Sequence, residues 1–371
     1  MMKKRNLLII AVLMALAVVF SACGNDANND ENSGVNTVVE IEQVENINDF
    51  VIDGNVLVSY SGTDENVIIP NGIVVIDENA FAENTTIKSV VIPETVTTVG
   101  NNAFGGCTSL VDITVPSSVY NVCYNAFAQT PWYDSLTDEF VLVGDSVLIK
   151  YNGTDTEISI PKGVKSVAYA FASNENITKM VMPKGLERIC EFAFYGCTNL
   201  ADVTIPDSVK RIDAFAFHAA KWYGELPKGF NIFGDGVLLR YANTDAETIV
   251  IPDGVKQIST AFYYNILLKE VTIPKSVEEI SSYAFYGAES IQKINIAEGL
   301  KKIGDASFGY CSSLAEIILP STVESIGYGS FGSCLALKEF YVGKGLTDIG
   351  EASFSACGAL EKIVVEEGNP S

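Results

Sequence analysis

A phenylalanine recurs at a fixed interval along most of the 371-residue chain, and this spacing restricts the fold more than any other feature. The interval is 23 residues, apart from two intervals of 44 and 45 residues. A unit this short cannot bury a core alone, so it must bury its apolar side chains against neighbouring units. The sequence therefore predicts a stack of short coils with the rings in one internal column. The column residues are Phe81, Phe104, Phe127, Phe171, Phe194, Phe217, Phe262, Phe285, Phe308, Phe331 and Phe354.

Each unit also carries a strand-forming segment, as in Leu200 to Pro206. Its β-branched residues alternate near the end, which is typical of a strand, and the closing proline cannot donate to a ladder. Val209 and Ile212 follow at a spacing that allows a second short strand across the coil. We therefore expect a mostly β solenoid of about twelve parallel-stranded coils, with β-hairpin inserts and little helix.

Three hairpin-like segments repeat every 90 residues, starting at Phe50, Phe140 and Phe230. In each, apolar runs flank a turn rich in glycine and aspartate, which indicates a β-hairpin. The second and third segments are preceded by Trp132 and Trp222. The sequence thus predicts a solenoid over residues 50–371 with hairpin inserts near residues 50–60, 131–151 and 221–241.

The unit L-x-x-V-x-I-P-x-x-V-x-x-I-x-x-x-A-F, seen in Leu110–Phe127 and Leu200–Phe217, resembles the BspA-type bacterial leucine-rich repeat. The resemblance covers about Val67 to Val365, which is most of the chain. It implies a leucine-rich-repeat solenoid with a curved or twisted stack of parallel strands on an exported surface protein. It also implies binding to host or neighbouring-cell proteins, by analogy of fold.

The N-terminus has the pattern of an export signal. Three basic residues precede an apolar run from Leu7 to Phe20, which is shorter than the roughly 20 apolar residues that span a bilayer. Small residues before Cys23 resemble a lipobox, so we expect residues 1–22 to be a lipoprotein signal peptide and Cys23 to be lipidated. The alternative is an ordinary secretory signal in which Cys23 is incidental. Lipidation would place the protein on the bacterial cell surface, anchored to the outer face of the membrane.

The distribution of charged residues predicts a tether before the solenoid, and the net charge excludes some classes of binding partner. Residues 23–49 are rich in Asn, Asp and Glu, which predicts a flexible acidic tether. Across the chain 46 acidic residues face 24 basic ones, giving a net charge of −22. Because binding to phosphates and anionic lipids needs Lys and Arg, we expect no nucleic-acid partner. Membrane contact is expected through the N-terminal lipid only.

The sequence shows no constellation typical of catalysis. The chain has one histidine, His218, and neither metal-ligand spacing nor a phosphate-binding loop stands out. We therefore expect no enzyme activity, no cofactor and no metal site. Acidic turns after the hairpins, such as Thr63 to Glu65, are either solvated turns or Ca²⁺ ligands, without EF-hand spacing.

Most cysteines follow the repeat. Five of them lie three residues after a column phenylalanine, where other coils have Asn, Thr or Ala, so the position is small and points inward. Stacked pairs among the last three are geometrically compatible with a disulfide, but three thiols cannot all pair. Cys123 and Cys190 occupy another repeat position in non-adjacent coils and are expected not to meet. The five are Cys107, Cys197, Cys311, Cys334 and Cys357.

Two surfaces are candidates for partner binding. Ile318, Tyr341 and Val364 occupy the outward strand position in consecutive coils, which predicts an apolar patch on the outer sheet face. Trp132 and Trp222 can stack on sugars or anchor a protein, although packing of the insert against the coil is the alternative. The chain stops just after a strand, and an open edge there would allow edge-to-edge self-association. The alternatives are that the last turn folds over this edge or that the sequence is truncated.

These observations favour an exported, lipid-anchored surface protein that mediates protein or glycan recognition or adhesion through its leucine-rich repeats. One alternative is a solute-binding lipoprotein of a transporter, which requires a hinged cleft that a continuous solenoid lacks. The other is a passive structural surface protein.

Overall fold

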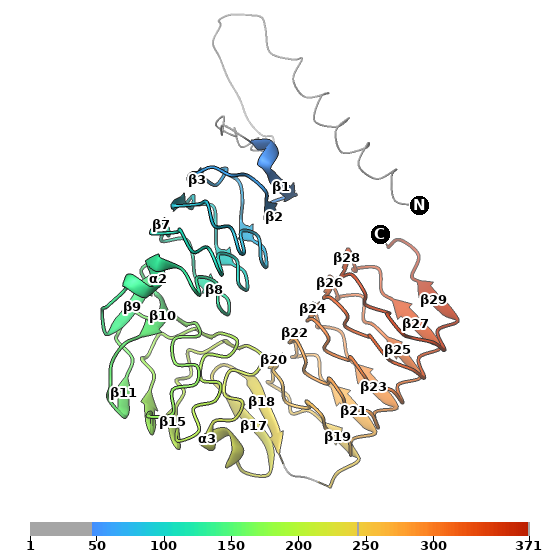
Figure 1. Ribbon diagram of the computed structural model, residues 1–371. Coiled ribbons are helices and arrows are strands. Elements are labelled where there is room, and N and C mark those ends of the chain that lie inside the picture. Colours follow the sequence, from blue (N-terminus) through green and yellow to red (C-terminus); the bar gives the residue numbers. More distant parts are fainter. Residues whose placement is uncertain (1–46, 243–244, 370–371) are drawn as a thin grey trace, which may run out of the picture. The chain divides into compact units, whose positions relative to one another are not determined.

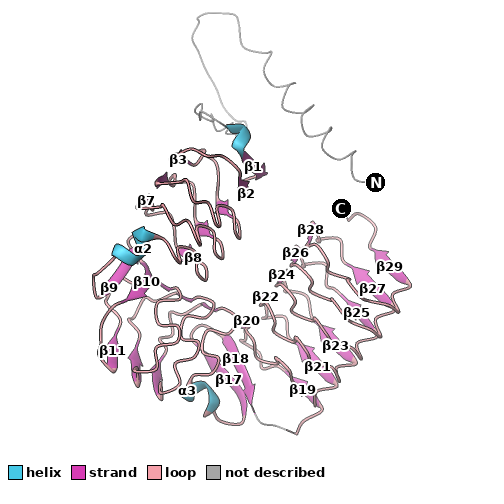
Figure 2. Ribbon diagram, viewed as in Figure 1, coloured by secondary structure: helices cyan, strands magenta, loops and turns pink. Residues whose placement is uncertain are grey.

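The computed structural model describes residues 47–242 and 245–369, and it is a solenoid of about 13 turns built mostly from short strands. Figure 1 shows the coils following one another in chain order, and Figure 2 shows that strands and turns make up nearly all of each coil. The predicted mostly β leucine-rich-repeat solenoid with parallel strands and little helix is confirmed.

One side of the solenoid carries the strands of the L-x-x-V-x-I segments, which we call the outer strands. They form four parallel sheets of three strands each. Equivalent residues of consecutive coils pair within a sheet, as Ile318, Tyr341 and Val364 do. The outer strands are β3 (Asn66–Ile68), β5 (Ser89–Val91), β7 (Asp112–Thr114), β11 (Glu157–Ser159), β13 (Lys179–Val181), β15 (Asp202–Thr204), β19 (Thr248–Val250), β21 (Glu270–Ile273), β23 (Lys293–Ile296), β25 (Glu316–Ile318), β27 (Glu339–Val342) and β29 (Lys362–Val365).

Another side carries two-residue strands from the V-x-x-I segments, which we call the inner strands. Within each block, every inner strand pairs in parallel with the inner strand of the next coil. The second residue of each inner strand is a buried aliphatic residue, except in β28, where Ile349 is exposed. The inner strands are β4 (Val75–Ile76), β6 (Thr98–Val99), β8 (Asn121–Val122), β12 (Ser166–Val167), β14 (Arg188–Ile189), β16 (Arg211–Ile212), β20 (Gln257–Ile258), β22 (Glu279–Ile280), β24 (Lys302–Ile303), β26 (Ser325–Ile326) and β28 (Asp348–Ile349).

Three antiparallel hairpins begin the three inner ladders. The second strand of each hairpin also pairs in parallel with the first inner strand that follows it, so the hairpin belongs to the solenoid wall. The hairpins divide the solenoid into a first block (50–130), a second block (140–220) and a third block (229–369). Their strands are β1 (Phe50–Asp53) with β2 (Val56–Tyr60), β9 (Phe140–Val143) with β10 (Val147–Tyr151), and β17 (Gly229–Phe233) with β18 (Val237–Ala242).

Helix is confined, within the described residues, to three short segments: η1 (Ile47–Asp49), α2 (Pro131–Ser135) and α3 (Lys221–Gly224). Thr130 caps α2, because its hydroxyl accepts a hydrogen bond of 3.1 Å from the Tyr133 amide, and a proline suits the first position of a helix. The two α-helices connect consecutive blocks and carry the Trp–Tyr pairs.

The column phenylalanines form three stacks, one in each block, rather than the single column expected from the sequence. Within a block the rings are nearly parallel, as in Phe171 and Phe194, whose centroids lie 5.2 Å apart at 7°. At the end of the second block the stack stops at Trp222, whose ring meets Phe217 at 61° and 5.1 Å. Each hairpin then starts a new stack with rings of its own, such as Tyr151 and Tyr241. A single column does not form because each hairpin insert is part of the solenoid wall and separates the stacks of the two blocks beside it.

The five cysteines after the column phenylalanines are free thiols. Each thiol donates to the carbonyl oxygen of the column phenylalanine one coil earlier, as Cys197 does to Phe171 at 3.1 Å. Burial raises the pKa of Cys107 to about 11 and that of Cys197 to about 12. These thiols therefore satisfy a buried carbonyl in the turning backbone and are poor nucleophiles.

Consecutive blocks meet at two junctions, where coils that are not neighbours in a ladder touch. At the first junction the Asn121 carboxamide accepts from the Cys190 thiol at 3.8 Å and lies 3.7 Å from the Cys123 sulfur. Cys123 and Cys190 thus both contact the Asn121 side chain across the junction, and both are free thiols. At the second junction the Gln257 side chain accepts from the Ile212 amide at 3.0 Å.

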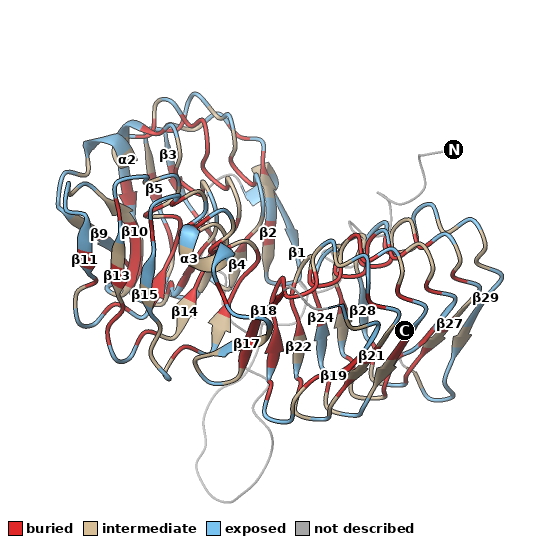
Figure 3. Ribbon diagram, turned by 90° about the horizontal axis from the view of Figure 1, so that it is seen from below, coloured by how far each residue is buried: buried red, intermediate tan, exposed pale blue. Residues whose placement is uncertain are grey.

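Buried residues line the inside of the coils, and exposed residues lie on the turns and on the outward positions of the outer strands (Figure 3). The predicted signal peptide, Cys23 and most of the predicted tether lie outside the described residues. Within residues 47–242 and 245–369, no helix is long and apolar enough to cross a membrane.

Candidate functional site

Aromatic side chains gather on the turns of the middle coils, in a cluster that we call the aromatic surface. Its rings contact one another from Tyr124 in the first block, through Phe192 and Phe215 in the second, to Tyr286 in the third. We define the aromatic surface by the rings of Tyr124, Phe192, Tyr195, Phe215, His218, Tyr263, Tyr264, Tyr283, Tyr286 and Tyr310. It crosses both junctions and belongs to no single coil.

Most of these rings occupy two repeat positions, two residues before and one residue after a column phenylalanine. The aromatic surface is not evident from the strand positions of the repeat, because its rings stand on the turns and His218 is the single histidine of the chain. An alignment of the repeats at these two positions would have found it. In the middle coils the positions hold Phe192, Phe215, Tyr283, Tyr195, His218, Tyr263 and Tyr286, whereas the first block has Asn79, Asn102, Asn125, Ala82, Gly105 and Ala128.

A pocket of about 370 Å³ opens beside the aromatic surface at the second junction. His218 and Tyr223 reach it from the second block, Arg240 from β18, and the loop Tyr263–Leu267 from the first coil of the third block. This loop exposes apolar side chains: Tyr264 is 54% exposed, Ile266 58% and Leu267 49%. An exposed apolar group beside aromatic rings is typical of a binding surface.

The Arg240 guanidinium is fixed against Tyr223. One of its N–H groups donates to the Tyr223 carbonyl oxygen, and its Cζ lies 4.7 Å from the centre of the Tyr223 ring. Burial and the nearby Arg240 charge lower the pKa of His218, so the imidazole is neutral at pH 7. Burial raises the pKa of Tyr223 and of Tyr263, which keeps both hydroxyls protonated. The pocket thus offers flat neutral rings, hydroxyl donors and one cation.

Acidic side chains lie at the edge of the aromatic surface. Burial, reinforced by Asp213, Asp305 and Glu78, raises the pKa of Glu191 to about 7. Asp213 differs, because Arg188 and Arg211 donate to it at 2.7 and 2.5 Å. Burial alone would raise the pKa of Asp213, but the two arginines outweigh burial and lower it. Asp213 is therefore a charged anchor of the second junction.

The predicted outer patch is present as neighbouring side chains on β25, β27 and β29. Ile318 is 58% exposed, whereas Tyr341 and Val364 are half-buried. The Tyr341 hydroxyl donates to the Glu339 carboxylate, so its polar end is occupied. β29 is the edge strand of its sheet, and self-association there stays a prediction.

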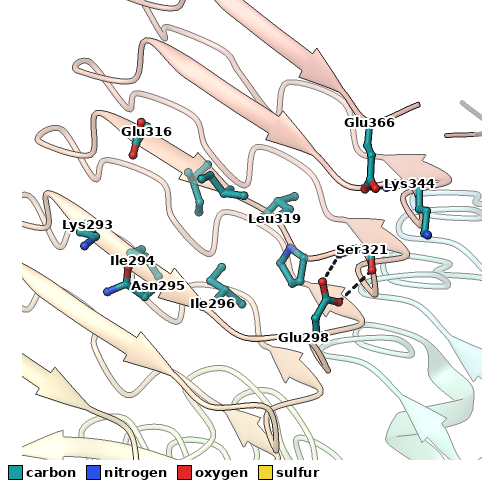
Figure 4. Close-up of a pocket in the computed structure, with 13 residues that line it drawn as sticks. Lys293, Ile294, Asn295, Ile296, Glu298, Glu316, Leu319, Ser321, Lys344 and Glu366 are labelled. Carbon is teal, nitrogen blue, oxygen red and sulfur yellow. Dashed lines mark hydrogen bonds between the residues drawn. The ribbon is translucent and has the colours of Figure 1, made fainter. Parts of the chain in front are cut away.

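A second pocket, of about 490 Å³, lies next to Ile318, where the outer ladder is interrupted between β23 and β25 although the repeat interval stays at 23 residues. Figure 4 shows its walls, with Lys293 and Asn295 on one strand and Glu316 on the other. At one end Glu298 accepts hydrogen bonds from the Ser321 amide and hydroxyl, at 3.2 and 3.1 Å. Among the other charged residues of the pocket, Lys293 pairs with Glu270 at 3.3 Å, and Glu366 accepts a hydrogen bond from the Lys344 amide at 3.1 Å.

The two tryptophans pack against the stacks, in line with the packing alternative. Trp132 lies 5.0 Å from Phe127 at 67°, and Trp222 meets Phe217 in the same way. Both are half-buried, and Trp132 also borders a pocket of about 370 Å³ near Val143. Among the described residues, no three His, Cys, Asp or Glu side chains form a group that could hold a metal ion.

Comparison with known proteins agrees with this architecture. The family model for the BspA type leucine rich repeat region matches six copies, over residues 37–136, 151–235 and 240–361. The chain belongs to this family. As a BspA-type repeat protein, it shares the architecture of a family defined by the coil described above, and the resemblance read from the sequence is confirmed.

Several solved structures are similar to this BspA-type protein. A leucine rich cell surface protein from Faecalibacterium prausnitzii is 24% identical, with 92% of this chain and 96% of that chain covered and a TM-score of 0.41. A leucine-rich repeat protein from Bacteroides ovatus is 25% identical, with 85% and 94% covered and a TM-score of 0.31. The pneumococcal vaccine antigen PcpA is 18% identical, with 89% of each chain covered and a TM-score of 0.38. No curated protein matches the chain.

Proposed function

We propose that this BspA-type protein is an exported, lipid-anchored cell-surface protein that recognises a protein or glycan partner through the aromatic surface. Lipidation of Cys23 would anchor it to the outer face of the membrane, and residues 23–49 would separate the solenoid from the lipid. Membership of the BspA-type family and the export pattern of the N-terminus support this location.

The observation that carries the proposal is the backbone conformation beneath the rings. Phe192, Phe215 and Tyr283 have φ angles of 59°, 56° and 61°, in the left-handed region. That region costs a residue with a bulky side chain roughly 1 kcal/mol, and Asn tolerates it better. The first block has Asn102 at this position, with φ of 52°. Bulky rings therefore occupy strained backbone positions in the middle coils at a cost to stability, which is typical of functional positions.

A binding panel tests the proposal. Immobilised purified extracellular proteins and glycans are incubated with the full chain, and the strongest binder is then used to compare variants. Tyr264→Ser with Leu267→Ser is expected to weaken binding at least about tenfold, since buried aromatic and aliphatic anchors dominate interfaces. Ile318→Asp, on the outer strands, serves as the matched control and should bind like the wild type.

If Ile318→Asp weakens binding and the variant with Tyr264→Ser and Leu267→Ser binds like the wild type, the outer patch is favoured as the binding site. Ile318 is well exposed and lies beside a pocket. Tight binding of a free small solute, seen as a large thermal shift, would favour a solute-binding lipoprotein. Binding to no component of the panel by either wild type or variants would favour a passive structural role.

A further inference from the structure

Arg240 differs from the other arginines at this junction. Among the residues that the structure describes, Arg188 and Arg211 share Asp213, whereas Arg240 forms no ion pair. Of the described side chains that line the pocket at the second junction, Arg240 alone carries a charge. A half-buried guanidinium loses hydration, and a carboxylate is the partner that best restores its hydrogen bonds.

Part of the role of Arg240 is structural, as the second block shows. Lys150 holds the equivalent place on β10, and its Nζ donates to the carbonyl oxygens of Tyr133 and Leu136 at 2.9 and 3.0 Å. Its Nζ lies 4.9 Å from the Tyr133 ring, much as Arg240 lies over Tyr223. Lys150 therefore holds α2 against its hairpin, and Arg240 holds α3 in the same way. Arginine has five N–H groups, so Arg240 keeps donors after this contact.

The loop facing the cation differs between the two blocks. Aligned on their column phenylalanines, the second block has Ala172, Ser173, Asn174, Glu175 and Asn176, and the third has Tyr263, Tyr264, Asn265, Ile266 and Leu267. An acidic residue in one loop is thus replaced by an aliphatic one in the other, and small residues by rings. The second junction combines an unpaired cation with an exposed apolar loop.

We propose that Arg240 receives a carboxylate of the ligand, and that the ligand is a peptide segment of a partner protein with an acidic residue beside an aliphatic or aromatic one. The carboxylate binds the guanidinium, and the neighbouring side chain packs on Tyr264, Ile266 and Leu267. Their large exposed apolar area favours a hydrocarbon side chain over a hydroxyl-rich sugar. The inference rests on the proposed binding role of the aromatic surface.

The test uses the full chain and a displayed library of random peptides of about 12 residues. Peptides selected on the wild type are expected to be enriched in Asp or Glu next to Leu, Ile, Phe or Tyr. For the best peptide, Arg240→Gln should raise Kd at least about tenfold, and Arg240→Lys, which lacks the planar fork, should fall between Arg240→Gln and the wild type. Lys150→Gln is the matched control, since it removes an equivalent helix-fastening cation, and should leave Kd unchanged. Melting curves confirm that each variant folds.

Selected peptides without acidic residues, or a Kd unchanged in Arg240→Gln, would overturn the inference. If no peptide is selected, or if uronic-acid glycans on an array bind in an Arg240-dependent manner instead, the assignment to a peptide is wrong. The Tyr264→Ser variant distinguishes a failure of the anion inference from a failure of the proposed binding site on the aromatic surface. If it abolishes binding while Arg240→Gln does not, the aromatic surface remains the site and only the anion inference fails. If neither variant matters, both fail.

Discussion

Trp222 closes the aromatic stack of the second block by meeting Phe217 at 5.1 Å and 61°. This contact gives the tryptophan a structural role, so Trp222→Ala should lower the free energy of unfolding by about 1.5–3 kcal/mol, since its ring is half-buried. Denaturant unfolding measures the change. Tyr328→Ala, at a residue that is 61% exposed, is the control and should change stability little. An unchanged stability for Trp222→Ala would return this tryptophan to the list of partner-binding candidates.

Asp213 should be indispensable at the second junction. It holds Arg188 and Arg211, and Arg211 also pairs with Glu279 of the third block. Asp213→Asn leaves two partly buried cations with less compensation, which costs about 3–5 kcal/mol when a buried pair is broken. Thermal unfolding should show a large loss of stability. Asp202→Asn is the comparison, because that carboxylate makes an exposed pair with Lys179, and a similar loss in both variants would contradict the anchoring role.

Glu191 makes the stability depend on pH. Its pKa is raised from 4.5 to about 7, so between these values the folded protein holds a proton that the unfolded chain has released. This carboxyl therefore lowers stability as the pH rises through that window. Glu191→Gln should be neutral near pH 4 and stabilise by about 1–3 kcal/mol near pH 8. Melting temperatures across this range measure the effect. A pH-independent effect of Glu191→Gln would be evidence against the shift.

Cys23 is predicted to carry the lipid. Cys23→Ser should release the protein from the membrane fraction into the medium and abolish labelling by a fatty-acid analogue, because a lipobox cysteine is the attachment site of the anchor. Cell fractionation and labelling measure both. Cys107→Ser, deep in the first block, controls for general effects of losing a thiol. Retention of the Cys23→Ser variant on the cell would favour another mode of attachment.

The coil architecture could be predicted from the sequence because it depends on local repeats. Phenylalanine spacing, the closing prolines and the β-branched segments each act within one coil and its neighbour. The junctions could not be predicted in this way. The contacts of Asn121 with Cys190 and of Arg211 with Glu279 join coils that are two or more steps apart, and they depend on how each hairpin redirects the wall.

The candidate binding surfaces, too, could be predicted from the sequence only in part. Ile318, Tyr341 and Val364 were placed together correctly from the strand register. The aromatic surface was missed because its members come from three blocks, although each ring stands at a repeat position that an alignment would have exposed. The interruption between β23 and β25 leaves no trace in the repeat interval, so the pocket in Figure 4 could not be foreseen.

Hydroxyl-radical footprinting of the full chain, alone and with the strongest binder of the panel, tests the central claim most directly. Tyrosine and aliphatic side chains react readily when exposed, so the method reports on both candidate surfaces. We predict strong protection of Tyr264, Ile266 and Leu267, with Ile318 and Tyr328 unchanged. Protection of Ile318 and Tyr341 with an unprotected Tyr263–Leu267 loop would contradict the claim that partners bind at the aromatic surface.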